Sequence, residues 1–284
     1  FSMNRLDAIK SIAAQAARGE LTFPANVDAS LKLQQALADP DCHIEAAAKL
    51  VQADPLLAAR TVAIANSVAF NRSGNEITSV RNAVQRLGVR TLQSVVASLI
   101  VRQLGSTITD PVLQAKANQL WEHTAHVAAL SQVLARRVTR VDPDTALFAG
   151  IVHEVGGFYL LSRAAEFPGI LDGEPQDWVE HGEQAIGHGV LTKLKVPEAV
   201  MHAIDSLWEG LRAIPPESLG DTLLLANDLA PVASPLNESP AAIAVRAARA
   251  ARSIDCVIGD DMTLSSILAE SDDEVQSLLK VLVH

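Results

Sequence analysis

Apolar residues recur every three or four positions along almost the whole chain, which is the spacing of one face of an α-helix. The clearest example is the stretch 111–138, in which Leu113, Leu120, Val127 and Leu134 return every seven residues. No convincing run shows the strict apolar–polar alternation of a half-buried strand. The pattern therefore predicts an all-α fold, a multi-helix bundle.

Helix-start and helix-stop residues divide this pattern into separate helices. Aspartate followed by proline, an N-cap residue before a favoured first-turn residue, starts helices at Asp54-Pro55 and Asp142-Pro143. Gly88 joins two short helices, and Ser271-Asp-Asp-Glu274 has the spacing of a capping box that opens the last helix. The predicted helices cover residues 3–18, a stretch ending near 39, 44–52, 55–67, 80–88, 89–104, 111–138, 143–153, 176–194, 197–211, 217–230, 240–254 and the C-terminal stretch after 271.

Two segments stand out as boundaries between groups of helices. The segment Gly105–Pro111 separates an N-terminal helical subdomain, residues 3–105, from a second helical subdomain, residues 106–230. The proline-rich stretch PVASPLNESP (231–240) opens a C-terminal helical extension, residues 231–284, which we expect to pack on the rest.

The composition is that of a folded globular protein, with 49% apolar and 20% charged residues. The net charge of −10 argues against a broad nucleic-acid surface, because phosphate binding needs a basic face. Cys42 and Cys256 are far apart and fit no CxxC pattern, so we expect no disulfide and a cytoplasmic location. The longest uncharged stretches, such as residues 91–101, reach about half the roughly 20 residues of a membrane helix, so we expect no membrane segment.

Residues 79–104 could pass for a DNA-binding helix-turn-helix, because two amphipathic helices meet at Gly88 with arginines nearby. The familiar pattern has a small residue four positions before the turn glycine, whereas Ala83 precedes Gly88 by five. A core-forming helical hairpin is therefore the favoured interpretation. The arginine cluster at 136–140 is interpreted as a solvated helix end that compensates the helix dipole.

Three helices carry polar side chains on their apolar faces. His123 shares the apolar stripe of its helix, His153-Glu154 ends another, and Asn227 lies one turn after the apolar residues of a third. Such positions could form a metal site inside a bundle, or could be buried groups that hydrogen-bond to one another or to water. The spacing alone favours the second interpretation.

Several segments stand in a recognisable order along the chain. They are LTFPANVDASLKLQQAL (21–37), ADPLLAARTVAIANSVAF (53–70), ITSVRNAVQRLGVRTLQSVVAS (77–98), LWEHTAHVAALSQVLAR (120–136) and ALFAGIVHEVGGFYLL (146–161), with VPEAV (196–200) further on. Together, from about Leu21 to Ala230, they resemble the HDOD family, bacterial signalling output domains related to HD phosphohydrolases. The resemblance implies that 3–105 is the N-terminal helical subdomain of an HDOD protein and 106–230 an HD-like subdomain.

The resemblance also indicates which residues occupy the metal-site positions. Catalytic HD enzymes bind metal through a histidine, an adjacent His-Asp pair and a later aspartate. The matching positions here are His123, His153, Glu154 and Asn227, so both aspartates are replaced. The longer glutamate displaces its oxygens, and asparagine is a poor ligand for a divalent transition ion.

Three further polar residues could complete a shell. Glu183 stands near a position where related sequences can carry another histidine, and His181 and His188 lie close to it in sequence. Gly157 stands where related sequences often carry the lysine of HDxGK.

We therefore expect a regulatory, non-catalytic HDOD module of bacterial signal transduction. It would bind a signalling protein partner or a small ligand, with no cofactor beyond a weakly held iron, manganese or zinc ion. The main alternative is a divergent metal-dependent phosphohydrolase acting on a nucleotide or cyclic dinucleotide, in which Glu154 replaces the aspartate. A transcriptional regulator using the 79–104 hairpin is the third hypothesis. The sequence leaves the oligomeric state open.

Overall fold

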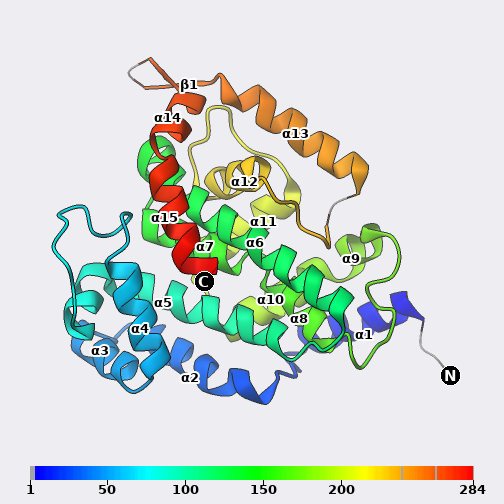
Figure 1. Ribbon diagram of the computed structural model, residues 1–284. Helices are drawn as coiled ribbons and strands as arrows, with labels where there is room; N and C mark the ends of the chain where they lie inside the picture. The colour runs from blue at the N-terminus through cyan, green and yellow to red at the C-terminus, as the bar shows by residue number, and fades with distance from the viewer. Residues whose placement is uncertain (1–3, 238, 260, 284) are drawn as a thin grey trace.

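The structure, a computed structural model, describes residues 4–237, 239–259 and 261–283, so Met3, the predicted helix start, lies outside it. Helices dominate the described residues, and the all-α prediction is confirmed (Figure 1). The α-helices are α1 (Arg5–Ala17), α2 (Asp28–Leu37), α3 (Ile44–Gln52), α4 (Pro55–Ala65), α5 (Val80–Ser106), α6 (Pro111–Leu134), α7 (Pro143–Val152), α8 (Val155–Arg163), α9 (Pro175–His181), α10 (Glu183–Lys193), α11 (Glu198–Glu209), α12 (Leu219–Leu229), α13 (Pro240–Ile254), α14 (Leu264–Glu270) and α15 (Asp272–Val283). The 3₁₀-helix η1 (Ala25–Val27) precedes α2, and the π-helical turn η2 (Ala135–Thr139) ends α6.

The structure differs from the predicted elements at two places. The helix predicted over 176–194 is two helices, α9 and α10, which meet at Gly182. A Cβ at Gly182 would lie 2.8 Å from the Ile9 side chain, so glycine allows α1 to pack against this junction. The sequence also gave no signal for the short antiparallel hairpin of β1 (Val257–Ile258) and β2 (Met262–Thr263). Helix α5 keeps the predicted break, since Gly88 has a φ of 77°.

The arginine cluster after α6 is not a solvated helix end. Arg136 pairs with Glu274, and Arg137 pairs with Glu270 at 2.7 Å. The Arg137 guanidinium also donates to the Ser271 hydroxyl at 3.1 Å. The Glu274 carboxylate of the predicted capping box is thus used to tie α15 to the end of α6.

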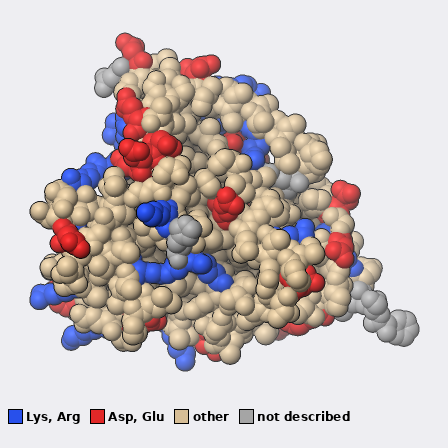
Figure 2. Space-filling model, in the orientation of Figure 1, with Lys and Arg blue, Asp and Glu red and all other residues tan. Residues whose placement is uncertain are grey.

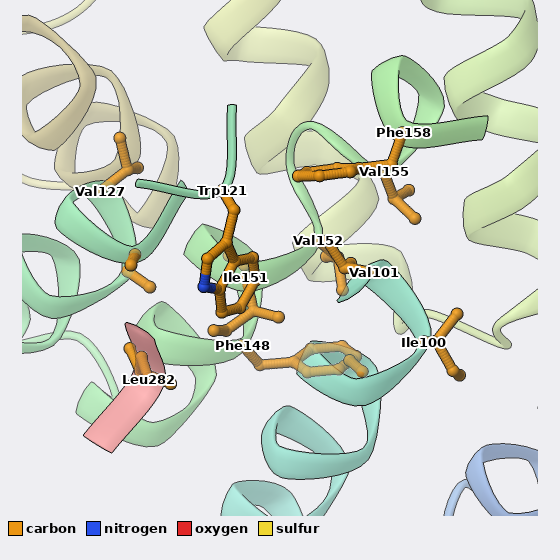
Figure 3. Close-up of a cluster of buried hydrophobic side chains, with 14 of the residues drawn as sticks. Ile100, Val101, Trp121, Val127, Phe148, Ile151, Val152, Val155, Phe158 and Leu282 are labelled. Atoms are coloured by element: carbon orange, nitrogen blue, oxygen red, sulfur yellow. The ribbon is translucent and has the colours of Figure 1, made fainter. Parts of the chain in front are cut away.

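The core lies where α5, α6, α7, α8 and α15 meet (Figure 3). Its buried side chains include Ile100, Val101, Trp121, Val127, Phe148, Ile151, Val152, Val155, Phe158 and Leu282. Helices α6 and α7 approach closely because α7 has Gly150 against Ala128 of α6. A Cβ at Gly150 would lie 2.9 Å from the Ala128 nitrogen and closer still to its Cα. This contact fixes the distance between the two helices that carry the candidate histidines.

The two ends of the chain pack against its middle. Helix α1 packs on α9 and α10, and α15 packs on α4 and α6, as Figure 1 shows for the red C-terminal helix. The boundaries proposed at residues 105–111 and 231–240 stay predictions.

One helical stretch, Pro143–Arg163, is long and apolar enough to cross a membrane by length and composition. In the folded chain 89% of its most apolar window is buried against other helices. The apolarity of α7 and α8 is therefore accounted for by their central position in the core.

Helix α12, which carries Asn227, begins with a capping box. The Ser218 hydroxyl accepts from the Asp221 backbone N–H at 3.0 Å, and Asp221 accepts from the Ser218 backbone N–H at 3.1 Å. The same carboxylate accepts from the backbone N–H groups of Ala213 and Glu217. Burial alone would raise the pKa of Asp221, but these donors hold it below its usual value.

Asp221→Asn should lower the free energy of unfolding at neutral pH by about 1 kcal/mol, since the charged cap is lost. Because the folded pKa is depressed, this contribution is fully present above the unfolded value of 3.8 and is lost as the pH falls through the folded value. Urea unfolding between pH 6 and pH 2 should therefore show wild type and variant converging in acid. A constant difference over that range would contradict the assignment.

Candidate functional site

Two buried histidines face each other at the junction of α6 and α7. His123 lies on α6, His153 follows the last residue of α7, and they are 0% and 4% exposed. Their Nε2 atoms are 3.4 Å apart, and their ring centroids are 5.4 Å apart. The structure therefore brings together the two histidines that the sequence placed on separate apolar faces; we call them the histidine pair.

Backbone carbonyls set the protonation of the histidine pair. Nδ1 of His153 lies 2.6 Å from the Gly150 carbonyl, and Nδ1 of His123 lies 2.7 Å from the Val232 carbonyl. A carbonyl can only accept, so each Nδ1 carries a proton and each neutral ring has a lone pair on Nε2. Burial lowers the pKa of His123 to about 4 and that of His153 to about 3. At neutral pH two Nε2 lone pairs thus point at one another.

Two carboxylates lie beside the histidine pair and share one amide. Glu154 precedes α8 and Glu183 begins α10. The Asn237 amide nitrogen donates to Glu154 Oε1 at 3.2 Å and also to Glu183 Oε1. The Asn237 oxygen accepts from the Trp178 indole at 3.0 Å. Burial raises the pKa of Glu183 to about 7, in opposition to the hydrogen bond from Asn237, which lowers it.

Asn227, the residue at the last aspartate position, reaches the histidine pair. It is half-buried on α12 and lines the cavity beside the pair, and its side chain acts on the His123 ring in the direction that raises the pKa of that ring. The next residue, Asp228, is a buried carboxylate but pairs with Arg249 at 2.7 Å on another side of α12. Asp228 therefore does not take the place of the aspartate that Asn227 replaces.

Of the three further candidate ligands, one lines the site and two do not. Glu183 lines the same cavity as His153 and Glu154. His188 instead bonds Asp205 at 2.7 Å and packs edge-on against Trp208, and its side chain is 45% exposed. His181 lies near Glu180 at the end of α9. Neither histidine lines the cavity beside the histidine pair. His181 lies on α9, before the break at Gly182, and His188 lies five positions after Glu183 on α10, about 140° around the helix.

The segment 231–237, which follows α12, closes the site, and sequence reasoning missed its part. It supplies the Val232 carbonyl, Asn237 and the buried Leu236. A Cβ at Gly157 would lie 2.7 Å from Leu236, so Leu236 fills the space that a side chain at Gly157 would enter. A Pro-rich sequence outside the helical pattern gave no sign of these contacts.

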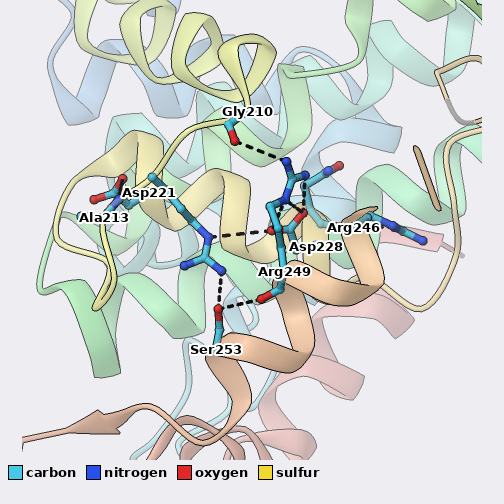
Figure 4. Close-up of polar contacts among 9 residues, drawn as sticks. Gly210, Ala213, Asp221, Asp228, Arg246, Arg249 and Ser253 are labelled. Atoms are coloured by element: carbon cyan, nitrogen blue, oxygen red, sulfur yellow. Dashed lines mark hydrogen bonds and ion pairs between the residues drawn. The ribbon is translucent and has the colours of Figure 1, made fainter. Parts of the chain in front are cut away.

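Helix α13 lines the cavity through Ala242, Arg246 and Arg249, and Figure 4 shows its arginines beside α12. Arg249 binds Asp228 and the Gly210 carbonyl, and Arg246 donates to the carbonyls of Asn227 and Ala230. The remaining cavity, about 170 Å³, is lined by the carboxylates, His153 and these arginines. This volume is below the roughly 300 Å³ at which small-molecule pockets usually begin.

The donor set fits a metal ion only in part. Two nitrogens bound to one tetrahedral ion at about 2.0–2.1 Å lie roughly 3.3 Å apart, close to the separation of the histidine pair. One Glu154 oxygen lies within 4.8 Å of both rings. These three groups could hold a divalent ion, which would supply Lewis acidity. Asn227 offers no charge at the fourth position, and Asn237 hydrogen-bonds Glu154, so we expect weak binding.

Restoring both aspartates should strengthen metal binding. The double variant Glu154→Asp with Asn227→Asp should bind Zn²⁺ at least tenfold more tightly than wild type in calorimetric titration, because it regains a charged ligand. Adding His153→Ala should remove the gain. Equal affinities for wild type and the double variant would show that these residues do not surround the ion.

Residues 23–206 match the HDOD domain family, and no curated protein matches the chain. The chain is similar in structure to a "Putative metal-dependent phosphohydrolase" from Shewanella amazonensis SB2B (TM-score 0.72, 19% identity), covering 99% of this chain and 100% of that one. It also resembles an HDOD domain protein with unknown function from Geobacter sulfurreducens (TM-score 0.61, 21% identity, 98% of each chain). A "Putative signal transduction protein" from Marinobacter aquaeolei VT8 aligns with a TM-score of 0.57 and 19% identity, covering 99% of this chain and 67% of that one.

At these identities the similarity to solved structures shows the fold alone, whereas the match to the family model over residues 23–206 shows the family. The chain belongs to the HDOD family.

Proposed function

We propose that this chain is a regulatory module of bacterial signal transduction, which acts in the cytoplasm by binding and not by catalysis. The proposal rests on the position of the Asn237 amide, which hydrogen-bonds both Glu154 and Glu183. A substrate that approached the histidine pair would have to pass between these two carboxylates, where the amide lies. Family membership supports a signalling role, as does the similarity to the Marinobacter protein, whose name describes signal transduction.

The closed site argues against phosphoester hydrolysis. Metal-dependent hydrolysis needs an ion held firmly enough to lower the pKa of a bound water, together with room for the substrate. Here one ligand position is Asn227, and the cavity of about 170 Å³ is too small for a nucleotide. We propose that the histidine pair and its neighbours now hold α6, α7 and α12 together.

We also propose that the 79–104 hairpin does not read DNA. The part of α5 after Gly88 is buried along most of its length, so it cannot enter a groove. Arg86 donates to the Ala65 and Asn75 carbonyls, and Arg90 donates to Gln93 at 2.7 Å. The partner is therefore a signalling protein or a small ligand, consistent with the net charge of −10.

Hydrolysis assays test this proposal. Wild type, His153→Ala and His188→Ala should give the same background rate with bis(p-nitrophenyl) phosphate and with cyclic dinucleotides, each with added Mn²⁺, Fe²⁺ or Zn²⁺. His188 is the matched control, because it lies outside the site. A metal-dependent rate that is lost in His153→Ala but kept in His188→Ala would overturn the proposal.

A metal-dependent rate that is lost in His153→Ala would favour the alternative function, a divergent metal-dependent phosphohydrolase. The observation in its favour is the histidine pair itself, whose two Nε2 lone pairs converge with a separation of 3.4 Å. Two such lone pairs repel, and a cation bound between them would remove that repulsion. The Shewanella protein, whose name describes such an enzyme, shares the fold.

A further inference from the structure

A second and larger hollow lies away from the histidine pair. It holds about 700 Å³, lies among α4, the end of α5, α6 and α15, and shares no lining residue with the cavity beside the histidine pair. Figure 2 shows Lys and Arg side chains gathered near the centre of this face, beside a hollow. Its apolar walls include Leu56, Leu99, Ile108, Leu279 and Val283. This volume is within the usual range for small-molecule sites.

Two arginines line this hollow, which we call the arginine groove. Arg60 comes from α4 and Arg102 from α5, and Glu122 of α6 lines the groove as well. Among the described residues, neither Glu122 nor any other carboxylate lies within ion-pair distance of either arginine. Burial and then the charge of Arg102 lower the pKa of Arg60. A protein without a ligand here would gain nothing from two neighbouring like charges partly removed from water.

Further polar atoms of the arginine groove have no partner in the described part of the chain. The Arg102 Nη1, Gln103 Oε1 and Trp121 Nε1 atoms are buried and make no hydrogen bond to any residue within 4–237, 239–259 or 261–283. Trp121 is only 7% exposed, and the Arg102 guanidinium lies over its ring at 5.9 Å from the centroid. Buried polar groups are normally satisfied, so three such atoms around one hollow indicate a missing partner.

We propose that the arginine groove binds a small organic anion with a flat apolar body. Its phosphate or carboxylate head lies between Arg60 and Arg102, because guanidinium groups bind both heads through paired hydrogen bonds. Its body packs against Leu56, Leu99 and Leu279. The inference goes beyond the proposed function, since it concerns a separate site and holds whether or not the histidine pair binds metal.

Calorimetric titration with 1-naphthyl phosphate and 1-naphthoate tests the proposal on the full chain. At least one anion should bind with one molecule per chain, and neutral 1-naphthalenemethanol should bind at least tenfold more weakly. Arg60→Gln and Arg102→Gln should each weaken the anion at least tenfold. Arg81→Gln, an exposed arginine in the first turn of α5, is the matched control and should not change the affinity.

The titrations distinguish a phosphate ligand from a carboxylate ligand, and they also show which results would contradict the proposal. Tighter binding of the phosphate assigns a phosphoryl ligand, and tighter binding of the carboxylate assigns a carboxylate ligand. No saturable binding of either anion, or binding that Arg60→Gln and Arg102→Gln leave unchanged, would overturn the proposal. A hydrolytic activity at the histidine pair would contradict the proposed function and leave this inference standing.

A stability measurement tests the groove without any probe. Arg60→Gln should leave the Tm of the unliganded chain unchanged or raise it, because a like charge beside Arg102 is removed and no partner is lost. Arg249→Gln should lower the Tm by several degrees, because buried Asp228 loses its shortest ion pair and keeps only Arg212, at 3.8 Å. An equal loss in Arg60→Gln would mean that Arg60 has a structural role, and would overturn its assignment to a ligand.

Discussion

The close contact between α6 and α7 at Gly150 and Ala128 is the constraint on which the site depends. Any larger residue at 150 would force the helices apart, because a Cβ there would already overlap the backbone of Ala128. The same contact places His123 and His153 with their Nε2 atoms 3.4 Å apart. The Gly150 carbonyl also accepts from His153 Nδ1, so this one residue sets both the distance and the tautomer of the ring.

The segment 231–237 turns this pair of helices into a closed site, although it lies outside the residues that match the family model. Its Val232 carbonyl accepts a hydrogen bond from His123 Nδ1, its Leu236 side chain fills the space beside Gly157, and its Asn237 amide lies between two carboxylates. Helix α13 holds the end of α12, just before this segment, because Arg246 donates to the Ala230 carbonyl and Arg249 pairs with Asp228. Glu154 and Asn227 stand where an HD metal shell has aspartates, and the C-terminal part of this chain contacts both of these residues.

The sequence predicted those features that depend on helical spacing. His123 and Asn227 lie where their apolar neighbours on one helix face placed them, near the junction of α6, α7 and α12. Features that depend on how distant segments meet could not be predicted. Asn237 lies in an irregular segment without periodicity, and the acidic residue after Asn227 turns to an arginine that is distant in sequence. The break at Gly182 separates His181 from Glu183, and His188 turns to Asp205 and Trp208, which are distant in sequence.

The histidine pair and the arginine groove differ in chemistry, and α6 carries residues of both. The pair presents two Nε2 atoms 3.4 Å apart, whereas two guanidinium groups line the arginine groove. Trp121 and His123 are two positions apart on α6, which places them roughly 200° apart around its axis. One residue therefore faces the groove and the other faces α7. Because the Gly150 contact leaves no space between α6 and α7, a displacement of α6 must either carry α7 with it or break that contact, and either result alters the surroundings of His153.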